Sequence, residues 1–300
     1  MRTLHSPIAL QNARTLAVAA MLGAVAAFAL MDWAMKILAA THSPMQVVFL
    51  RGLTSLPILL AWAGRAGLGP VRGLRWPLHL LRGLLGLAML GAFVKSLSLV
   101  SMSNAYAVYL GAPLLIALLS APLLGEHLRP GQWLAIVVGM AGVLVALRPS
   151  GDGLLGAGGL YAGLAALSYA AIAVTTRVLG RTDGVAAMTL SFVAVLTVGA
   201  GVAAWPDGIA VSSGEIGWIA LLGIAGAVGQ LLMTVSFSLA PPATVAPFEF
   251  TALLWALAFD WLWWHVLPDA ALVVGALLIV ASGLHLVRQG PARPAAGREE

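Results

Sequence analysis

The chain has 300 residues, of which 61% are hydrophobic and only 9% are charged, and its mean hydropathy is +0.98. A soluble globule needs more polar surface than this composition supplies, so the sequence predicts an integral membrane protein. The net charge of +5 is read as a membrane-topology signal, which excludes nucleic acid as an expected partner. The chain has no cysteine and its six histidines show no metal-ligand spacing, so we expect neither a metal nor a cofactor.

The hydrophobic residues are grouped in runs that match the thickness of a bilayer, which a helix of roughly 20 residues spans. We therefore predict an all-α integral membrane fold with ten transmembrane helices, divided at clusters of Gly, Pro and charge. The polar residues before the first run are expected to be a cytoplasmic segment rather than a cleaved signal peptide. The ten predicted spans are residues 16–38, 45–63, 77–98, 102–124, 131–148, 155–178, 185–204, 215–238, 244–266 and 270–287.

Basic residues between the spans indicate the orientation of the chain. Ten spans place both ends on one side of the membrane. With the ends inside, the cytoplasmic segments contain nearly all of the arginines outside the spans, whereas the opposite loops contain Arg148 together with acidic residues. We predict a multi-pass protein of a bacterial inner membrane with both termini cytoplasmic.

The sequence repeats itself weakly at a constant offset of 140 positions: Gly83 aligns with Gly223, and Ser96 aligns with Ser236. Each half then has five spans. Because five is odd, the second half enters the membrane from the opposite side, which is the inverted-repeat architecture of transporters, although duplication also builds channels. The predicted units are an N-terminal segment at 1–15, a first repeat at 16–148, a second, inverted repeat at 149–287 and a C-terminal tail at 288–300.

Inverted repeats allow a carrier to open to either side around a site near the bilayer midplane. We expect a central cavity lined by spans 1, 3, 4, 6, 8 and 9, which contain most of the polar residues. An intramembrane enzyme is disfavoured because no Ser-His, Asp-Asp or His-metal arrangement occurs at a useful spacing. No Walker motif is present, which disfavours ATP-driven pumping by this chain alone.

Five charged residues within the spans predict a buried charge network. Ionisable groups at membrane depth cost roughly 2.5 to 3.5 kcal/mol each, so they normally face a bundle interior or a watery cavity. Asp32 and Lys36 are four residues apart on one helical face and can neutralise each other. Asp260 is expected in the outer third of the membrane near Lys36, Arg51 and Lys95, where it would stabilise helix contacts. Arg51 and Lys95 could instead extend to the interface.

The stretch "PFEFTALLWALAFDWLWWH", residues 247–265, contains a second acid, Glu249. At 100° per residue, Glu249 and Asp260 fall on one stripe of an α-helix. The offset of 140 pairs Glu249 with Tyr109, which adjoins Tyr106. A carboxylate opposite aromatic hydroxyls is a plausible cradle for an ammonium group, so Glu249 is expected to line the transport path and to handle substrate or protons.

Prolines inside predicted spans indicate where helices bend. Pro113 and Pro247 are expected to kink spans 4 and 9 and to free carbonyl groups that could face a cavity. Four further polar or aromatic residues are candidates for substrate contact: Asn104, Tyr169, Gln230 and Trp255.

The stretch "SMSNAYAVYLGAPLLIALLSAPLLGEHLRPGQWLAIVVGMAGVLVAL" resembles the fourth and fifth helices of the EamA family of the drug/metabolite transporter superfamily. The second half repeats the pattern as "PPATVAPFEFTALLWALAFDWLWWHVLPDAALVVGALLIVASGLHL", with His265 and Val266 in place of the Gly-Glu pair. The resemblance extends from about residue 16 to residue 288. It implies a ten-helix carrier, most often an exporter of amino acids or other small metabolites, and the YddG-like amino-acid exporter type is the nearest we suggest.

Two functions follow as hypotheses. The first is export of small, zwitterionic metabolites such as amino acids by alternating access. The alternative is a proton-coupled multidrug or lipophilic-cation exporter in which Glu249 exchanges a proton for the cation.

Overall fold

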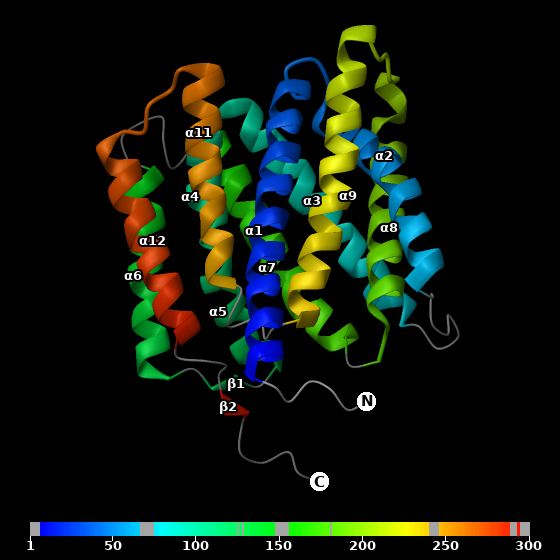
Figure 1. The fold of residues 1–300 in the computed structure, drawn as a ribbon. Helices are drawn as coiled ribbons and strands as arrows, with labels where there is room; N and C mark the ends of the chain where they lie inside the picture. The colour runs from blue at the N-terminus through cyan, green and yellow to red at the C-terminus, as the bar shows by residue number, and fades with distance from the viewer. Residues whose placement is uncertain are drawn as a thin grey trace.

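A computed structural model describes residues 7–66, 75–124, 126–127, 129–147, 156–180, 182–239, 246–288 and 293–294. The helices run side by side along one axis (Figure 1). The main helices are α1 (Pro7–Leu38), α2 (Pro44–Ala66), α3 (Trp76–Leu99), α4 (Met102–Tyr109), α5 (Ala112–Leu124), α6 (Pro130–Leu147), α7 (Ala157–Leu179), α8 (Val185–Ala204), α9 (Ile216–Leu239), α11 (Ala252–Trp264) and α12 (Ala270–Arg288).

Short elements complete the described fold. Three are 3-10 helices: η1 (Trp205–Asp207), η2 (Ser213–Glu215) and η3 (Ala246–Thr251). Two residues of β1 (Glu126–His127) pair antiparallel with two of β2 (Arg293–Pro294), just beyond the end of α12. The start of α1 and the end of α12 lie at the same end of the bundle (Figure 1).

Six described helices are long and apolar enough to cross a membrane: Thr15–Leu38, Pro44–Arg65, Trp76–Leu99, Ala157–Leu179, Val185–Ala204 and Ser213–Ser236. Three shorter apolar helical stretches accompany them: Met102–Ile116, Pro130–Val145 and Ala270–His285. The chain is therefore a multi-pass membrane protein. The helix α1 begins at Pro7, whereas its apolar span begins at Thr15, next to the predicted start at residue 16.

The helices pack in four main pairs: α1 with α9, α3 with α7, α2 with α8 and α6 with α12. An offset of 140 residues converts α1 into α7 and α3 into α9, and it exchanges α2 with α8 and α6 with α12. The set of pairs is therefore unchanged when each helix is replaced by its counterpart in the other half.

Small residues let α6 and α12 approach until their backbones nearly touch. A Cβ added at Gly142 would lie 2.9 Å from the carbonyl oxygen of Gly275 and 2.8 Å from the Cβ of Leu278. Lipid tails are as apolar as the helix surfaces, so the hydrophobic effect does not drive helices together within a bilayer. Close van der Waals packing of this kind stabilises the helix pair instead.

The predicted fourth and ninth spans are not uniform α-helices. In the first half, α4 ends at Tyr109 and α5 begins at Ala112 after a short turn. In the second half, η3 gives way to α11 at Ala252. Ala252 lies 140 positions after Ala112, so both halves change helix at equivalent residues.

The prolines act differently from the expected kinks. Pro113 is the second residue of α5, a position where a missing N–H removes no helical hydrogen bond, so it helps to begin a helix. Pro247 lies within the 3-10 helix η3. The tighter winding of η3 also means that the count of 100° per residue, used to place Glu249 and Asp260 on one stripe, does not apply across this segment.

Candidate functional site

Three tyrosines from two helices gather with Phe93 of α3 to form what we call the tyrosine cluster: Tyr106 and Tyr109 of α4, Tyr169 of α7, and Phe93. The ring centroids of Phe93 and Tyr109 are 5.0 Å apart, and those of Tyr109 and Tyr169 are 5.4 Å apart. Tyr106 meets Phe93 edge-on at 5.6 Å. The cluster brings together three residues that we predicted for the path, and Tyr109 lies at its centre.

An acid and a base approach the tyrosine cluster from α1 and α2. Asp32 is buried and accepts a hydrogen bond from the hydroxyl of Tyr106, which is also buried. Arg51 interacts electrostatically with Asp32 and with Tyr109, without reaching ion-pair distance of the carboxylate. Its Nε donates a hydrogen bond to the sulfur of Met31 at 3.1 Å.

Glu249 enters the same neighbourhood from η3. It interacts electrostatically with Tyr109 and with Tyr169, and its side chain is only partly exposed. Among the described residues, no salt bridge involves Glu249. Carboxylates beside aromatic faces can hold an ammonium group, and a guanidinium can hold a carboxylate, so this cluster has the chemistry to bind a zwitterion.

Asp260 forms a separate, fully buried site near the start of α4. The backbone N–H groups of Met102 and Ser103 donate to its two oxygens at 3.0 and 2.6 Å, and the Ser103 hydroxyl donates at 2.6 Å. These are first-turn N–H groups, which have no acceptor within their own helix. Lys36 of α1 lies 3.6 Å from Asp260, above the ring of Trp264 at 4.5 Å.

The predicted proximity of Asp260 to Lys36 is confirmed, whereas the predicted pairing of Asp32 with Lys36 is wrong. Lys36 pairs with Asp260 rather than with Asp32, and its ammonium also donates to the carbonyl of Val100 at 3.0 Å. Arg51 is grouped with Asp32 instead of with Asp260. Lys95 belongs to neither group among the described contacts. The reason is that a facing helix, α11, presents a carboxylate to Lys36, which therefore pairs with Asp260 and not with Asp32, four residues earlier on α1.

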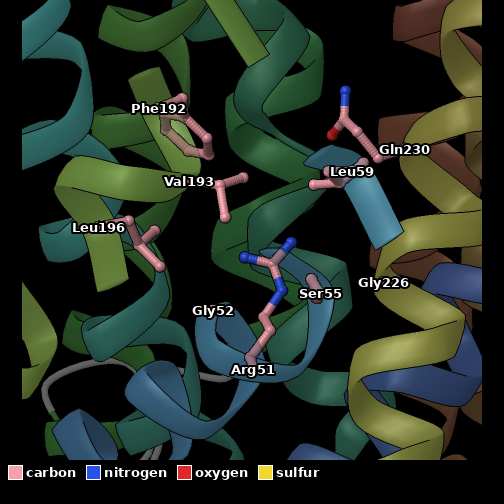
Figure 2. A pocket seen from close by; sticks show the side chains of 9 residues that line it. All are labelled: Arg51, Gly52, Ser55, Leu59, Phe192, Val193, Leu196, Gly226 and Gln230. Carbon is pink, nitrogen blue, oxygen red and sulfur yellow. The ribbon is translucent and has the colours of Figure 1, made fainter. Parts of the chain in front are cut away.

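A small cavity lies between α2, α8 and α9, with a volume of ≈ 10 Å³, which is room for about one water. Its wall includes Arg51 and Gln230 (Figure 2). This differs from the expected central cavity, because two of its three helices, α2 and α8, are the second and seventh predicted spans. No metabolite would fit there in this conformation.

The remaining predicted residues lie elsewhere. Asn104 lies in the first turn of α4, where its backbone N–H donates to the hydroxyl of Ser101 at 3.2 Å. Trp255 is 41% exposed and stacks on Phe259, away from the tyrosine cluster in the described ring contacts. Sequence reasoning missed Phe93 and Met89, whose sulfur lies 3.7 Å from the Tyr109 hydroxyl, since apolar residues on an apolar helix give no signal.

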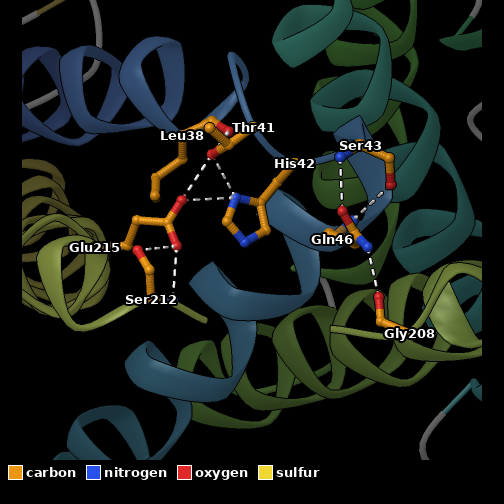
Figure 3. A network of polar contacts seen from close by, with 8 residues as sticks. All are labelled: Leu38, Thr41, His42, Ser43, Gln46, Gly208, Ser212 and Glu215. Atoms are coloured by element: carbon orange, nitrogen blue, oxygen red, sulfur yellow. Dashed lines mark hydrogen bonds and ion pairs between the residues drawn. The ribbon is translucent and has the colours of Figure 1, made fainter. Parts of the chain in front are cut away.

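Each end of the bundle has a set of polar contacts that joins neighbouring helices. At one end, which we call the Glu215 latch, the hydroxyl of Thr41 donates to Glu215 at 2.7 Å and His42 lies 3.5 Å from the same oxygen. The N–H and hydroxyl of Ser212 donate to the other oxygen (Figure 3). This latch joins the turn after α1 to the start of α9.

The opposite end has an equivalent contact, which we call the Asp183 latch. Nε2 of His79 in α3 lies 2.7 Å from the carboxylate of Asp183, and its Nδ1 lies 2.7 Å from the hydroxyl of Ser191. This latch joins the turn after α7 to the first turns of α3. Under the offset of 140 residues these are the same two places as in the Glu215 latch, with the histidine and the carboxylate exchanged. Among the described residues, no group of three or more His, Asp or Glu could hold a metal ion.

Comparison with known proteins places these observations in a family. The EamA-like transporter family matches the chain twice, at residues 15–148 and at residues 156–288. A riboflavin transporter of Rhizobium johnstonii is 31% identical over 237 residues, covering 79% of this chain and 77% of the relative. A pseudopaline exporter of Pseudomonas aeruginosa is 26% identical, covering 87% and 92%. An S-adenosylmethionine uptake transporter of Rickettsia bellii is 23% identical, covering 81% and 83%.

A solved crystal structure superposes with a TM-score of 0.61 at 23% identity and covers 89% of this chain and 98% of its own, which shows a common fold. The named relatives are membrane transporters and not enzymes. Since the family matches nearly the whole chain, in two successive copies, this protein belongs to the EamA-like transporter family.

Proposed function

We propose that this protein exports small zwitterionic metabolites by alternating access. Amino acids are the first candidate substrates, and the YddG-like amino-acid exporter is the proposed type. The observation that carries the proposal is the tyrosine cluster centred on Tyr109, which Glu249 and Arg51 approach from η3 and α2. A zwitterion has a cationic and an anionic end, and this cluster offers an acid and a base of matching charge. The proposed path contains Glu249, Tyr106, Tyr109, Tyr169, Gln230 and Asn104.

The architecture we propose is ten transmembrane helices in two inverted repeats, residues 16–148 and 149–287. The successive family matches and the symmetric pairing of the helices support it. The two non-uniform segments, α4 with α5 and η3 with α11, would be the discontinuous helices that many transporters use around their sites. The bacterial inner membrane, with both termini in the cytoplasm, is the proposed location.

The relatives support transport of small molecules but not one substrate, because their names give three chemically different cargoes and both directions of transport. A second candidate is proton-coupled export of lipophilic cations or drugs. The lack of a salt-bridge partner for Glu249 among the described residues favours it, since an unpaired intramembrane acid can exchange a proton for a cation.

Counterflow of labelled amino acids in proteoliposomes, with and without a proton gradient, tests the proposal. Glu249→Gln is expected to reduce transport while folded protein still reaches the membrane, and to alter the pH profile if protons are coupled. Asp269→Asn, a change in an exposed helix cap, is the control and should transport normally. Normal rates and pH profile for Glu249→Gln at normal expression would contradict this role. Transport of lipophilic cations alone would favour the second candidate.

A further inference from the structure

Arg51 is unusual because it is a charged side chain within a membrane helix and makes few hydrogen bonds. Among the described residues its one hydrogen bond is the Nε contact to the sulfur of Met31, a weak acceptor. A guanidinium has five N–H donors, and the other donors of Arg51 have no hydrogen-bond partner among the described residues. Most of its hydrogen-bonding capacity therefore remains available to a ligand.

Those donors point into the cavity between α2, α8 and α9. Figure 2 shows the guanidinium of Arg51 between Val193 and Ser55. The polar groups on the wall are the hydroxyl of Ser55, which donates to the carbonyl of Gly223 at 3.2 Å, and the amide of Gln230. The other side chains are aliphatic or aromatic, so a bound anion would meet one cation and few competing groups.

A glycine keeps this space open. A Cβ added at Gly226 would lie 3.0 Å from the sulfur of Met31, 3.4 Å from the hydroxyl of Ser55 and 3.6 Å from Nε of Arg51. An alanine at this position would press on the sulfur of Met31 and would lie in van der Waals contact with Nε of Arg51, so it would take up part of the space beside the guanidinium.

Structural neutralisation by Asp32 does not account for the arrangement. The two groups interact electrostatically but do not reach ion-pair distance, and Asp32 is already bonded to Tyr106. The other half of the protein has no corresponding cation: the residue 140 positions after Arg51 is Ser191, which is hydrogen-bonded to His79. The guanidinium thus breaks the symmetry of the two halves, as a substrate contact would.

We infer that Arg51 is an anion subsite: when the small cavity beside it widens during transport, the guanidinium binds the carboxylate of the substrate as a two-point donor. A planar carboxylate fits the fork of a guanidinium better than a spherical ion does. The inference rests on the proposed function, since it assigns the acidic end of the zwitterion.

Formate tests the subsite because it is the smallest carboxylate and needs the least widening of a cavity that has room for about one water. The purified full chain in detergent is heated at fixed ionic strength with formate, with chloride, or with uncharged formamide. A ligand that binds only the folded state raises the unfolding temperature with its concentration. We expect formate to raise it, chloride to raise it less and formamide to leave it unchanged.

Three variants locate the response. Arg51→Gln should abolish the formate shift, and Arg51→Lys should need roughly tenfold more formate for the same shift, because the ammonium cannot offer the paired donors. Gly226→Ala keeps the arginine but narrows the cavity, so it should weaken the shift even if Arg51→Gln fails to fold. Arg65→Gln is the control, since Arg65 is an exposed arginine in the last turn of the same helix, donates to the carbonyl of Ala61 and does not line the cavity.

Equal formate shifts in Arg51→Gln or Gly226→Ala and in the unaltered chain would overturn the subsite, as would no shift in the unaltered chain. Chloride acting as strongly as formate would also overturn it, because the cavity would then select charge rather than a carboxylate. These outcomes are separate from the proposed function: amino-acid counterflow without a formate shift refutes the subsite alone, and a formate shift at Arg51 without amino-acid counterflow refutes the proposed substrates alone.

Discussion

Asp260, on α11, holds the first turn of α4 by accepting the backbone N–H of Ser103 at 2.6 Å. Ser101 caps this helix start from its own chain segment, and a carboxylate from another helix satisfies two more of its free N–H groups. Lys36 of α1 supplies the compensating charge. Because α4 carries Tyr106 and Tyr109, this contact fixes the position of the tyrosine cluster relative to α1 and α11.

Asp260→Asn should therefore destabilise the protein strongly. The amide removes the negative charge, leaves Lys36 buried without its partner and can turn a donor towards the N–H groups, a loss of about 3 to 5 kcal/mol for a broken buried pair. Thermal unfolding in detergent measures it. Asp269→Asn alters an exposed cap of α12 and should cost about 1 kcal/mol or less. A similar loss of stability in both variants would show that the contact of Asp260 with α4 stabilises the fold no more than an exposed helix cap does.

Tyr106→Phe removes the hydrogen bond to Asp32 and leaves a buried carboxylate without that donor. A loss of about 1 to 3 kcal/mol is expected. Tyr161→Phe on α7 provides the comparison, because no described hydrogen bond uses that hydroxyl, and it should be nearly neutral. If the two unfold at the same temperature, the Tyr106 hydroxyl has no stabilising role.

Acid should weaken the Asp183 latch. Hydrogen bonds from Thr182 and from His79 hold the pKa of Asp183 below its ordinary value. A lowered pKa contributes stability that is present above the ordinary value, about 3.9, and is lost as the pH falls through the folded-state value. The unfolding temperature should thus fall more steeply between about pH 5 and pH 3 in the unaltered chain than in Asp183→Asn. Parallel slopes would contradict the assignment, and Asp269→Asn should retain the steep fall.

Gly142→Ala should loosen the packing of α6 on α12. The new Cβ would meet the backbone of Gly275, which cannot yield as a flexible side chain would, and overpacking of this kind costs about 1 to 3 kcal/mol. Gly163→Ala is the control, because a Cβ there meets nothing within 4 Å, and alanine favours a helix over glycine. A neutral Gly142→Ala would mean that the two helices can separate at little cost.

Labelling tests the proposed orientation. The chain has no cysteine, so single cysteines near Arg293 and near Asp207 can be probed one at a time in intact cells with a reagent that does not cross the membrane. The cysteine near Asp207 should label from outside and the one near Arg293 only after lysis. Labelling of both from the same side would refute the topology.

The apolar runs were sufficient to predict the helices and the membrane class, because length and hydropathy are local properties of the sequence. Membrane depth was also sufficient to place Asp260 near Lys36, but it could not separate Arg51 from Asp260, because the packing of α1 against α11 decides which charges at one depth come into contact. The switch at Ala252 was missed for a different reason: a 3-10 segment has the same composition as the α-helix that it interrupts. Of the predicted path residues, those with aromatic hydroxyls were brought together, whereas Trp255 was not.

The two latches affect the relative populations of the conformations that are open at one end or at the other. Both are formed together here, yet a protein that opens one end at a time must break one set of polar contacts and keep the other. The Asp183 side chain is 3% exposed and that of Glu215 is 17% exposed, so water replaces the contacts of Glu215 more readily. The resting population should therefore favour opening at the Glu215 end. Weakening one latch should shift this balance by mass action alone, without touching the substrate site, and distances between spin labels across each end would show which form has grown.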